Sequence, residues 1–262
     1  MNSSFSAPAK KSLGQHFLAD RYYIDRIVQA VDPRAGQHLV EIGPGQGAIT
    51  FPLLRKHGAL TVIEFDRDLI APLTETAAPM GALRIIHRDV LSVDFSALAD
   101  GTPIRLVGNL PYNISSPILF HVLDHAGAVA DMHFMLQKEV VDRMAAGPGS
   151  KVYGRLSVML QAYCKVTALF VVPPDAFRPP PKVDSAVVRL VPHDPATVQI
   201  NDRGRFAEVV RAGFGQRRKT LRNALSTVCK PAHFDTAQVL PEARAEQLEV
   251  ADFIRLANVE LA

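Results

Sequence analysis

Short apolar segments alternate with amphipathic ones through the first two thirds of the chain. Short runs rich in Val, Ile and Leu are typical of strands that are covered on both faces, whereas apolar positions with a helical repeat are typical of helices that bury one face. Strands are predicted from His38 onward and at 60–65, 83–87, 104–107, 131–137, 165–172 and 185–191. The last two are expected to form an antiparallel pair at the sheet edge. The alternation predicts an α/β fold.

The helix at 21–31 carries the clearest signals at both ends. Asp20 is a suitable N-cap, and an Asp-Pro pair at residues 32–33 stops the helix. Its apolar stripe consists of Tyr23, Ile27, Val28 and Val31. Further helices are predicted at 117–123, 138–146 and 155–163. A Gly-Pro-Gly-Ser segment at 147–150 separates the last two and predicts an exposed loop.

The pattern changes at Pro192. Beyond it, short amphipathic helices separated by Gly and Pro replace the strand and helix alternation. Their apolar positions include Phe206, Val209, Val210, Leu221 and Leu225. A chain of 262 residues with 48% hydrophobic content can form a core in each of two domains. We therefore predict a larger domain at 1–191 and a small helical domain at 192–262.

Composition excludes several classes of protein. No apolar run is long enough for a membrane span, and the first eleven residues lack the apolar core of a secretory signal. A motif that begins at Lys11 leaves no room for a transit peptide. Cys164 and Cys229 show no CxxC spacing, which predicts reduced thiols in a cytoplasmic protein. The nine histidines show no metal-ligand spacing, so no metal is expected.

Positive charge is concentrated in two segments, although the net charge is only +3. Lys10 and Lys11 form one cluster. The second consists of Arg211, Arg217, Arg218, Lys219 and Arg222, with no acid between them. Such clusters are typical of nucleic-acid-binding surfaces, and a solvated helix face is an equally good explanation of the second cluster taken alone.

A candidate cofactor site begins at the glycine-rich turn after the strand at His38. Gly43 and Gly45 allow the backbone to approach a ligand, and Ala48 lets the next helix lie near the strand. Glu64 follows Gly43 by 64 − 43 = 21 residues and ends the next strand, as expected for an acid that reaches ribose hydroxyls. Asp89 ends the third strand and could accept from an adenine amino group, although a turn cap is an alternative role for it.

A candidate catalytic loop follows the fourth strand, where open α/β sheets bind ligands. Gly108 is expected to let the backbone turn sharply, and Asn109, Leu110, Pro111 and Tyr112 follow it. Pro111 biases Leu110 away from helix, which leaves the Leu110 carbonyl without an intrahelical partner. Tyr112 adds a flat apolar face with a polar tip. An ordinary turn with a buried tyrosine would explain these four residues equally well.

This loop beside an adenosine site suits methyl transfer from S-adenosylmethionine to an exocyclic base nitrogen. The Asn109 side-chain oxygen and the Leu110 carbonyl would accept from the adenine N6 hydrogens and stabilise the charge that develops on nitrogen. Tyr112 would stack on the flipped base. The proline-rich segment at 172–185 is expected to hold a solvent-facing Phe177 against the other face, and a rigid connector is the alternative. No general base is required.

Six motifs carry a resemblance that covers nearly the whole chain. They are KSLGQHFL from residue 11, VEIGPGQG from 40, VIEFD from 62, NLPY from 109, FRPPPKVDS from 177 and FGQRRKTLRN from 214. The chain resembles the rRNA adenine N6,N6-dimethyltransferases, and within them the bacterial small-subunit KsgA/RsmA family. The resemblance implies a Rossmann-like class I S-adenosylmethionine-dependent methyltransferase sheet with a small all-helical C-terminal domain.

The same resemblance implies a reaction and a set of contacts. The reaction places two methyl groups on each of two adjacent adenosines near the 3′ end of 16S rRNA, late in small-subunit assembly. S-adenosylmethionine contacts are implied at His16, Leu18, Gly43, Glu64, Asp89 and Asn109. The family often has Asn where this chain has His16, so the contact implied there is through the backbone. RNA binding is expected at Lys10, Lys11, Arg217, Arg218, Lys219 and Arg222, and the enzyme is expected to be a monomer.

Three other functions share some of these features. The large-subunit dimethyltransferases that confer macrolide resistance have the same two loops, but the basic segment from 215 resembles the small-subunit branch. A binding protein, either an assembly factor or a mitochondrial transcription factor, would not need an intact Glu64, Asp89 and catalytic loop. A nicotinamide dehydrogenase could use the glycine turn and Glu64, but it would leave Asn109 to Tyr112 unexplained.

Overall fold

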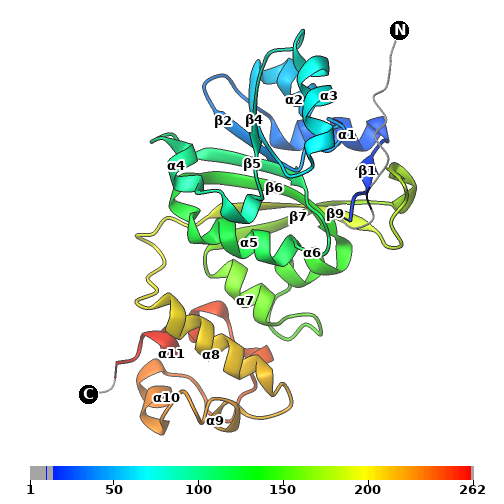
Figure 1. Ribbon diagram of the computed structural model, residues 1–262. Helices are drawn as coiled ribbons and strands as arrows, with labels where there is room; N and C mark the ends of the chain where they lie inside the picture. Colours follow the sequence, from blue (N-terminus) through cyan, green and yellow to red (C-terminus); the bar gives the residue numbers. More distant parts are fainter. Residues whose placement is uncertain (1–9, 11–13, 261–262) are drawn as a thin grey trace. The chain divides into compact units, whose positions relative to one another are not determined.

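The computed structural model describes residue 10 and residues 14–260 of the chain (Figure 1). The chain forms two compact units. The first consists of the chain up to Val141 together with Thr167–Pro192, and the second consists of Asp142–Val166 together with the chain from His193. The change of composition at Pro192 therefore coincides with the point where the chain passes from the first unit into the second. Residues 142–166, which the predicted domain 1–191 includes, group with the C-terminal unit.

A seven-stranded mixed sheet has the order β4-β3-β2-β5-β6-β9-β7. Its strands are β2 (His38–Ile42), β3 (Ala59–Glu64), β4 (Ala82–His87), β5 (Ile104–Asn109), β6 (Val129–Gln137), β7 (Cys164–Val172) and β9 (Ser185–Pro192). The five strands from β4 to β6 in this order pair in parallel, and β9 pairs antiparallel with β6. The predicted α/β fold is confirmed, and β7 and β9 are neighbours at the sheet edge as expected.

Two very short strands join distant parts of the first unit. β1 (Phe17–Leu18) pairs antiparallel with β8 (Phe177–Arg178), and Leu18 lies opposite Phe177. The amides of Ala19 and Asp20 extend this contact by donating to the Ala176 carbonyl at 2.8 and 3.1 Å. Strands of two residues show no periodicity, so the sequence pattern does not predict them. Through this pair the N-terminal motif lies beside the proline-rich segment.

The helices begin and end close to the predicted positions. α1 (Arg21–Val31) is capped by Asp20, whose carboxylate accepts from the Tyr22 amide at 2.8 Å. The others are α2 (Thr50–His57), α3 (Arg67–Ala77), α4 (Phe95–Ala99), α5 (Ser115–Asp124), α6 (Lys138–Ala145), α7 (Arg155–Gln161), α8 (Arg203–Gly215), α9 (Leu221–Ala224), α10 (Pro231–Ala237) and α11 (Val250–Asn258). Short 3₁₀ turns occur at Val90–Ser92, Ala126–Ala128, Pro174–Ala176 and Ala245–Gln247. α2 packs against β3 and α3 against β4 (Figure 1).

Gly108 has a different role from the one predicted. It lies inside β5, which continues to Asn109, and it is buried. A Cβ atom at this position would lie 2.5 Å from the Ile42 carbonyl oxygen. The expected sharp turn at Gly108 is therefore wrong, and glycine is needed because β2 and β5 approach closely there.

The second unit is helical around its own core, as predicted. The side chains of Phe206, Val209, Val210, Leu221 and Leu225 are fully buried. The rings of Phe214 and Phe253 stack with their centroids 5.5 Å apart. α8 packs against α7, α9 and α11. In the part of the chain that the structure describes, no helix is both long and apolar enough to cross a membrane.

Candidate active site

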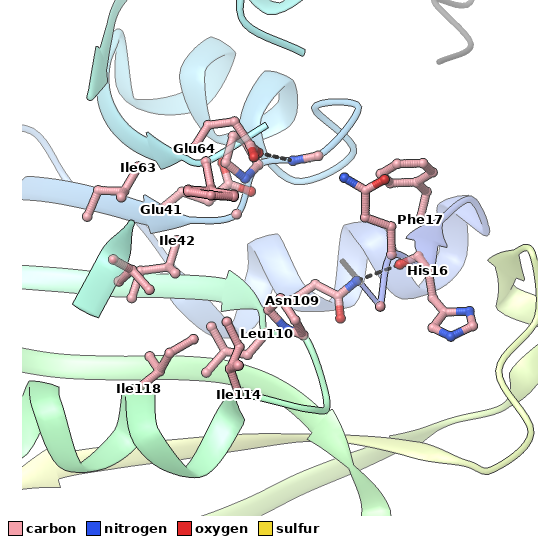
Figure 2. A pocket seen from close by; sticks show the side chains of 18 of the residues that line it. His16, Phe17, Glu41, Ile42, Ile63, Glu64, Asn109, Leu110, Ile114 and Ile118 are labelled. Carbon is pink, nitrogen blue, oxygen red and sulfur yellow. Dashed lines mark hydrogen bonds between the residues drawn. The ribbon is translucent and has the colours of Figure 1, made fainter. Parts of the chain in front are cut away.

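A cavity of about 260 Å³ lies in the first unit at the carboxyl ends of β2, β3 and β5. Every residue predicted to bind the cofactor lines it: His16, Leu18, Gly43, Gly45, Glu64, Asp89 and Asn109. Leu110, Pro111 and Tyr112 of the predicted catalytic loop line it as well. Figure 2 shows Glu41, Glu64, Asn109 and Leu110 around it, with an apolar wall that includes Ile42 and Ile118. The fold thus gathers the two predicted sites in one cavity.

The glycine-rich turn after β2 bends in the left-handed region that favours glycine. The φ angles of Gly43 and Gly45 are 68° and 55°. The Gly43 amide donates to the Ile63 carbonyl at 2.9 Å, which fixes the turn against β3. A Cβ at position 45 would lie 3.0 Å from the Phe17 ring. At Gly43 and Gly45 this wall of the cavity is therefore formed by backbone.

Glu64 ends β3 with its carboxylate at the cavity. The side chain is buried and accepts from the Asp66 amide at 2.7 Å and from the Gly45 amide at 3.4 Å (Figure 2). Burial raises the pKa of Glu64, and the two backbone donors only partly offset this. The amides orient the carboxylate, and its remaining lone pairs are available to hydroxyl donors in the cavity.

Glu41 is a second acid at the cavity, and it was not predicted from the sequence. It lies in β2 with an exposed fraction of 1%, and Thr50 Oγ1 donates to its Oε2 at 2.6 Å. Burial raises the pKa of Glu41 to about 8, although the hydrogen bond from Thr50 acts to lower it. The signal that could have found it is a charged residue inside an otherwise apolar strand. Such a group is costly to bury unless a ligand or partner compensates for it.

Asp89 lies at the cavity, where its predicted contact with adenine stays a prediction, and it also has the alternative role of a turn cap. It lines the cavity, and its carboxylate caps the turn at Val90–Ser92 by accepting from the Leu91 amide at 2.9 Å. Phe65, which follows Glu64, also lines the cavity and is 61% exposed. An exposed aromatic face beside two acids suits a flat heterocycle, so Phe65 is a further candidate contact that was not predicted from the sequence.

The catalytic loop is held from both sides. The Asn109 Nδ2 donates to the His16 carbonyl at 2.9 Å (Figure 2), so its Oδ1 is left to accept from a ligand. The Leu110 amide donates to the Met135 carbonyl at 3.1 Å. Among the described residues, no backbone amide donates to the Leu110 carbonyl. The two acceptors predicted from the sequence are thus both available.

Tyr112 is fixed at its hydroxyl and along its ring. Its hydroxyl lies 2.5 Å from the Oγ of Ser185, which is fully buried at the start of β9. The His16 ring stacks beside it with centroids 5.8 Å apart and planes 24° apart. The His16 Nδ1 in turn lies 2.9 Å from the Pro179 carbonyl. Tyr112 is half-buried and lines the cavity, which distinguishes it from the buried tyrosine of an ordinary turn.

Phe177 does not face solvent, and this part of the prediction is wrong. Its side chain is fully buried in the core of the first unit, and it is not among the residues that line the cavity. Pairing of β8 with β1 places Phe177 opposite Leu18, where burial of the large ring is favourable.

The predicted RNA-binding residues differ in their surroundings. The Lys10 ammonium contacts Asp66 at 2.6 Å and Asp68 at 2.7 Å, and Lys11 lies outside the described residues. Arg217 pairs with Glu246 at 2.9 Å and Arg222 pairs with Glu242 at 2.6 Å. Arg218 and Lys219 are exposed, and within residues 14–260 neither makes an ion pair.

The cysteines and the possible metal ligands among the described residues do not form a second site. Cys164 and Cys229 are both free and buried. Burial raises the pKa of the Cys164 thiol to about 12, which makes it unreactive. Where the structure describes the chain, no group of three or more His, Cys, Asp or Glu side chains could hold a metal ion.

Comparison with solved structures supports the fold and the family together. The dimethyladenosine transferase from Plasmodium falciparum has a TM-score of 0.78 at 26% identity, with 92% of this chain and 96% of that chain covered. The 23S rRNA methyltransferase ErmE has a TM-score of 0.72 at 25% identity, with 92% and 98% covered. Both likenesses extend over the sheet and the C-terminal helices.

Comparison with sequences is more specific. The ribosomal RNA small subunit methyltransferase A of Xanthomonas axonopodis pv. citri is 94% identical over 262 residues, all of both chains. The protein of that name from Xanthomonas campestris pv. campestris strain 8004 is 90% identical over the same length. The model of the ribosomal RNA adenine dimethylase family matches residues 7–260. With its predicted cofactor residues and the loop Asn109–Tyr112 gathered in one cavity, the chain is a member of the ribosomal RNA adenine dimethylase family.

Proposed function

We propose that this dimethylase acts on the small ribosomal subunit, where it methylates N6 of two adjacent adenosines near the 3′ end of 16S rRNA. Each adenosine receives two methyl groups from S-adenosylmethionine, late in assembly. The observation that carries the proposal is the single cavity in which Glu64 and the glycine turn face Asn109 and Leu110. Relatives with at least 90% identity carry the name small subunit methyltransferase A, which supports the choice of subunit.

The residues of the cavity fit S-adenosylmethionine, which supplies an electrophilic methyl group on a cationic sulfur. Glu64 would accept from ribose hydroxyls, and the turn at Gly43 and Gly45 would let the ligand approach the backbone. Glu41 is a buried carboxyl group whose one hydrogen bond within the described residues comes from Thr50. A cationic ligand nearby would favour its ionised form. Asp89 and Phe65 would contact the adenine ring.

The catalytic loop would prepare the target amine. The Asn109 Oδ1 and the Leu110 carbonyl accept from the two N6 hydrogens, which favours a pyramidal nitrogen and stabilises the positive charge that develops on it. Tyr112 supplies the face on which the flipped adenine stacks. The methylated nitrogen becomes acidic, so water can remove its proton without a protein base. Stacking on Phe177 would require that side chain to leave the core.

RNA binding, oligomeric state and location complete the proposal. Lys10, Lys11, Arg217, Arg218, Lys219 and Arg222 are the residues that we assign to the RNA-binding surface. Of the five that the structure describes, Arg218 and Lys219 are the two without an ion pair to a described residue. The enzyme is proposed to act as a monomer in the cytoplasm, where small subunits are assembled.

The decisive experiment measures methyl transfer from labelled S-adenosylmethionine to small subunits that lack dimethyladenosine. Large subunits and free duplex RNA serve as controls, and nucleoside analysis identifies the product. Dimethyladenosine in the small-subunit sample alone is the expected result. Transfer to large-subunit RNA would instead place the enzyme with the resistance dimethylases, a possibility raised by its likeness to ErmE. Tight binding without transfer would indicate an assembly factor.

The Asn109→Ala variant tests the role of the loop. We expect loss of transfer with largely intact binding to small subunits, because the side chain acts on N6 and contributes little to the RNA interface. Asn201→Ala, an exposed asparagine of the second unit, is the matched control and should behave like the unchanged protein. Near-normal turnover of Asn109→Ala would contradict the acceptor role.

A further inference from the structure

The basic segment at residues 217–219 lies on the turn between α8 and α9 in the second unit. Its three side chains differ in what they contact. Arg217 pairs with the Glu246 carboxylate at 2.9 Å, whereas Arg218 and Lys219 are exposed, with no ion pair to any described residue. The charge of Arg217 is therefore largely compensated within the protein, and the two residues after it carry the uncompensated charge of this turn.

Arg217 also binds the loop that precedes α7. Its Nη2 donates to the Lys151 carbonyl at 2.7 Å and to the Tyr153 carbonyl at 3.2 Å. A planar guanidinium can reach two carbonyls and a carboxylate at once, and a lysine ammonium cannot reproduce this geometry. These bonds place the backbone of Lys151 beside the turn that carries Arg218 and Lys219.

The loop has two further attachments to the same unit. The Gly149 amide donates to the Glu246 carbonyl at 2.7 Å, so Glu246 holds the loop while its carboxylate holds Arg217. The Tyr153 hydroxyl donates to the Leu248 carbonyl at 2.9 Å, and its ring is fully buried, edge-on to Phe214. The loop is therefore anchored at both ends, while Lys151 and Val152 between them are exposed.

We propose that residues 147–153 and the turn 216–219 form one RNA-binding surface, in which Lys151, Arg218 and Lys219 contact phosphates. Arg217 is the positioning residue that holds the loop in this surface. The inference rests on the proposed function, because it takes ribosomal RNA as the partner. It adds Lys151, which no basic run in the sequence indicates, and it gives Arg217 a role other than phosphate contact.

The chemistry of the surface suits a phosphate backbone. The three exposed cations lie on two segments that Arg217 joins, and the Glu246 carboxylate is neutralised by Arg217. Lysine and arginine contacts to phosphates release counterions, so each contact contributes to the dependence of affinity on salt. An acidic segment of a protein would also be attracted to these charges. If such a segment were the partner, the surface would contribute nothing to the affinity of the enzyme for protein-free RNA.

The first test compares Lys151→Ala with the unchanged enzyme in binding to small subunits that lack dimethyladenosine, over a range of salt concentrations. We expect the Kd of Lys151→Ala to be several-fold higher than that of the unchanged enzyme. The slope of its log Kd against log salt should be smaller by about 1. Lys165→Ala removes an exposed lysine on β7 of the same unit and is the matched control, with no expected change. Binding to protein-free 16S rRNA should show the same difference. A shift with whole subunits only would indicate a protein partner and overturn the proposal.

The second test separates position from charge with Arg217→Lys, which keeps the charge and loses the two carbonyl contacts. We expect this variant to bind as weakly as Lys151→Ala. We also expect the double variant to be little weaker than either single one, because both changes remove the same phosphate contact. Urea unfolding checks that the second unit remains folded. Wild-type affinity in Arg217→Lys, or additive losses in the double variant, would overturn the positioning role.

Methyl transfer distinguishes failure of this inference from failure of the proposed function. The KM of Lys151→Ala for small subunits should rise with its Kd, whereas Lys165→Ala, which lies outside the surface, should keep both its kcat and its KM. An unchanged enzyme that fails to methylate small subunits would refute the proposed function. Normal transfer together with unaltered binding of Lys151→Ala would refute only the surface.

Discussion

Two buried carboxyl groups at one cavity are the most unusual feature at the scale of single residues. Glu41 lies inside β2 and Glu64 ends β3, and burial raises the pKa of both carboxyl groups. A protein that only needed a stable core would place apolar side chains there, because buried acids are costly without a partner. The proposed cationic ligand explains why both are present.

Glu41 should make the ligand-free protein less stable as pH rises. Its pKa is about 8 when folded and 4.5 in a model compound, so between these values the unfolded chain releases a proton that the folded chain retains. Unfolding is therefore favoured as pH rises from 5 to 8, by a few kcal/mol at most. Glu41→Gln cannot ionise and should lose most of this dependence. Urea unfolding of both proteins at pH 5 and pH 8 measures it, and identical pH dependence would refute the assignment.

Ser185 should act through Tyr112. The 2.5 Å contact between their hydroxyls fixes the ring that would stack on the target base. Loss of one hydrogen bond of about 1 kcal/mol should lower kcat about fivefold in Ser185→Ala, with unchanged cofactor binding. Tyr112→Phe should have a similar effect, and the double variant little more. Ser185→Thr keeps the hydroxyl and should restore activity. Fully additive losses would show that Ser185 acts elsewhere.

At the scale of elements, the helices and strands that could be predicted are those in which apolar positions repeat regularly. The buried strands and α1 were predicted within a few residues, because their apolar patterns extend over several residues and their ends carry caps or prolines. The pair of β1 and β8 has no such pattern, since each strand has two residues. That pair determines the burial of Phe177, so an error about one side chain followed from a contact between segments far apart in the chain.

The position of the cavity and its residues at strand ends were predicted, whereas two other residues that line it were not. Strand ends converge in a parallel sheet, so the sequence could place Gly43, Glu64, Asp89 and Asn109 together. Glu41 lies inside a strand, and Phe65 becomes a cavity residue only through its exposed position after β3. Neither follows from motif spacing.

Gly108→Ala tests the close approach of β2 and β5. The added Cβ would lie 2.5 Å from the Ile42 carbonyl oxygen, and backbone on both sides restricts any adjustment. We expect a destabilisation of about 1–3 kcal/mol in urea unfolding, together with weaker cofactor binding, because Ile42 and Leu110 line the cavity. Gly127→Ala has open space around its Cβ and is the matched control. Equal stability of the two variants would contradict the proposed packing.

At the scale of the whole molecule, the chain crosses between its two units more than once. Residues 142–166 precede the last strands of the sheet and yet belong to the C-terminal unit. The composition of this segment could not show to which unit it belongs, because helices and loops of similar composition occur in both units. Only the partners of its buried side chains decide where it belongs, and those partners are distant in sequence.

This connectivity predicts how a truncated protein behaves. A chain that ends at Pro192 keeps residues 142–166 but loses the helices that cover them. The fully buried Tyr153 would lose Phe214 and the Leu248 carbonyl, and α7 would lose α8. Exposed apolar surface of this kind promotes aggregation. We expect poor solubility, dye binding to exposed apolar surface and a lower Tm than in the full chain.

A second truncation provides the control. Replacing residues 142–166 of the truncated chain with a short flexible linker removes the uncovered segment as well. If the sheet unit folds by itself, this chain should be soluble, melt cooperatively and bind S-adenosylmethionine, since every residue that lines the cavity lies in the first unit. A simple truncation at Pro192 that is as stable as the full chain would show that residues 142–166 do not depend on the C-terminal helices, and the sequence-based boundary at 191 would then be the better description.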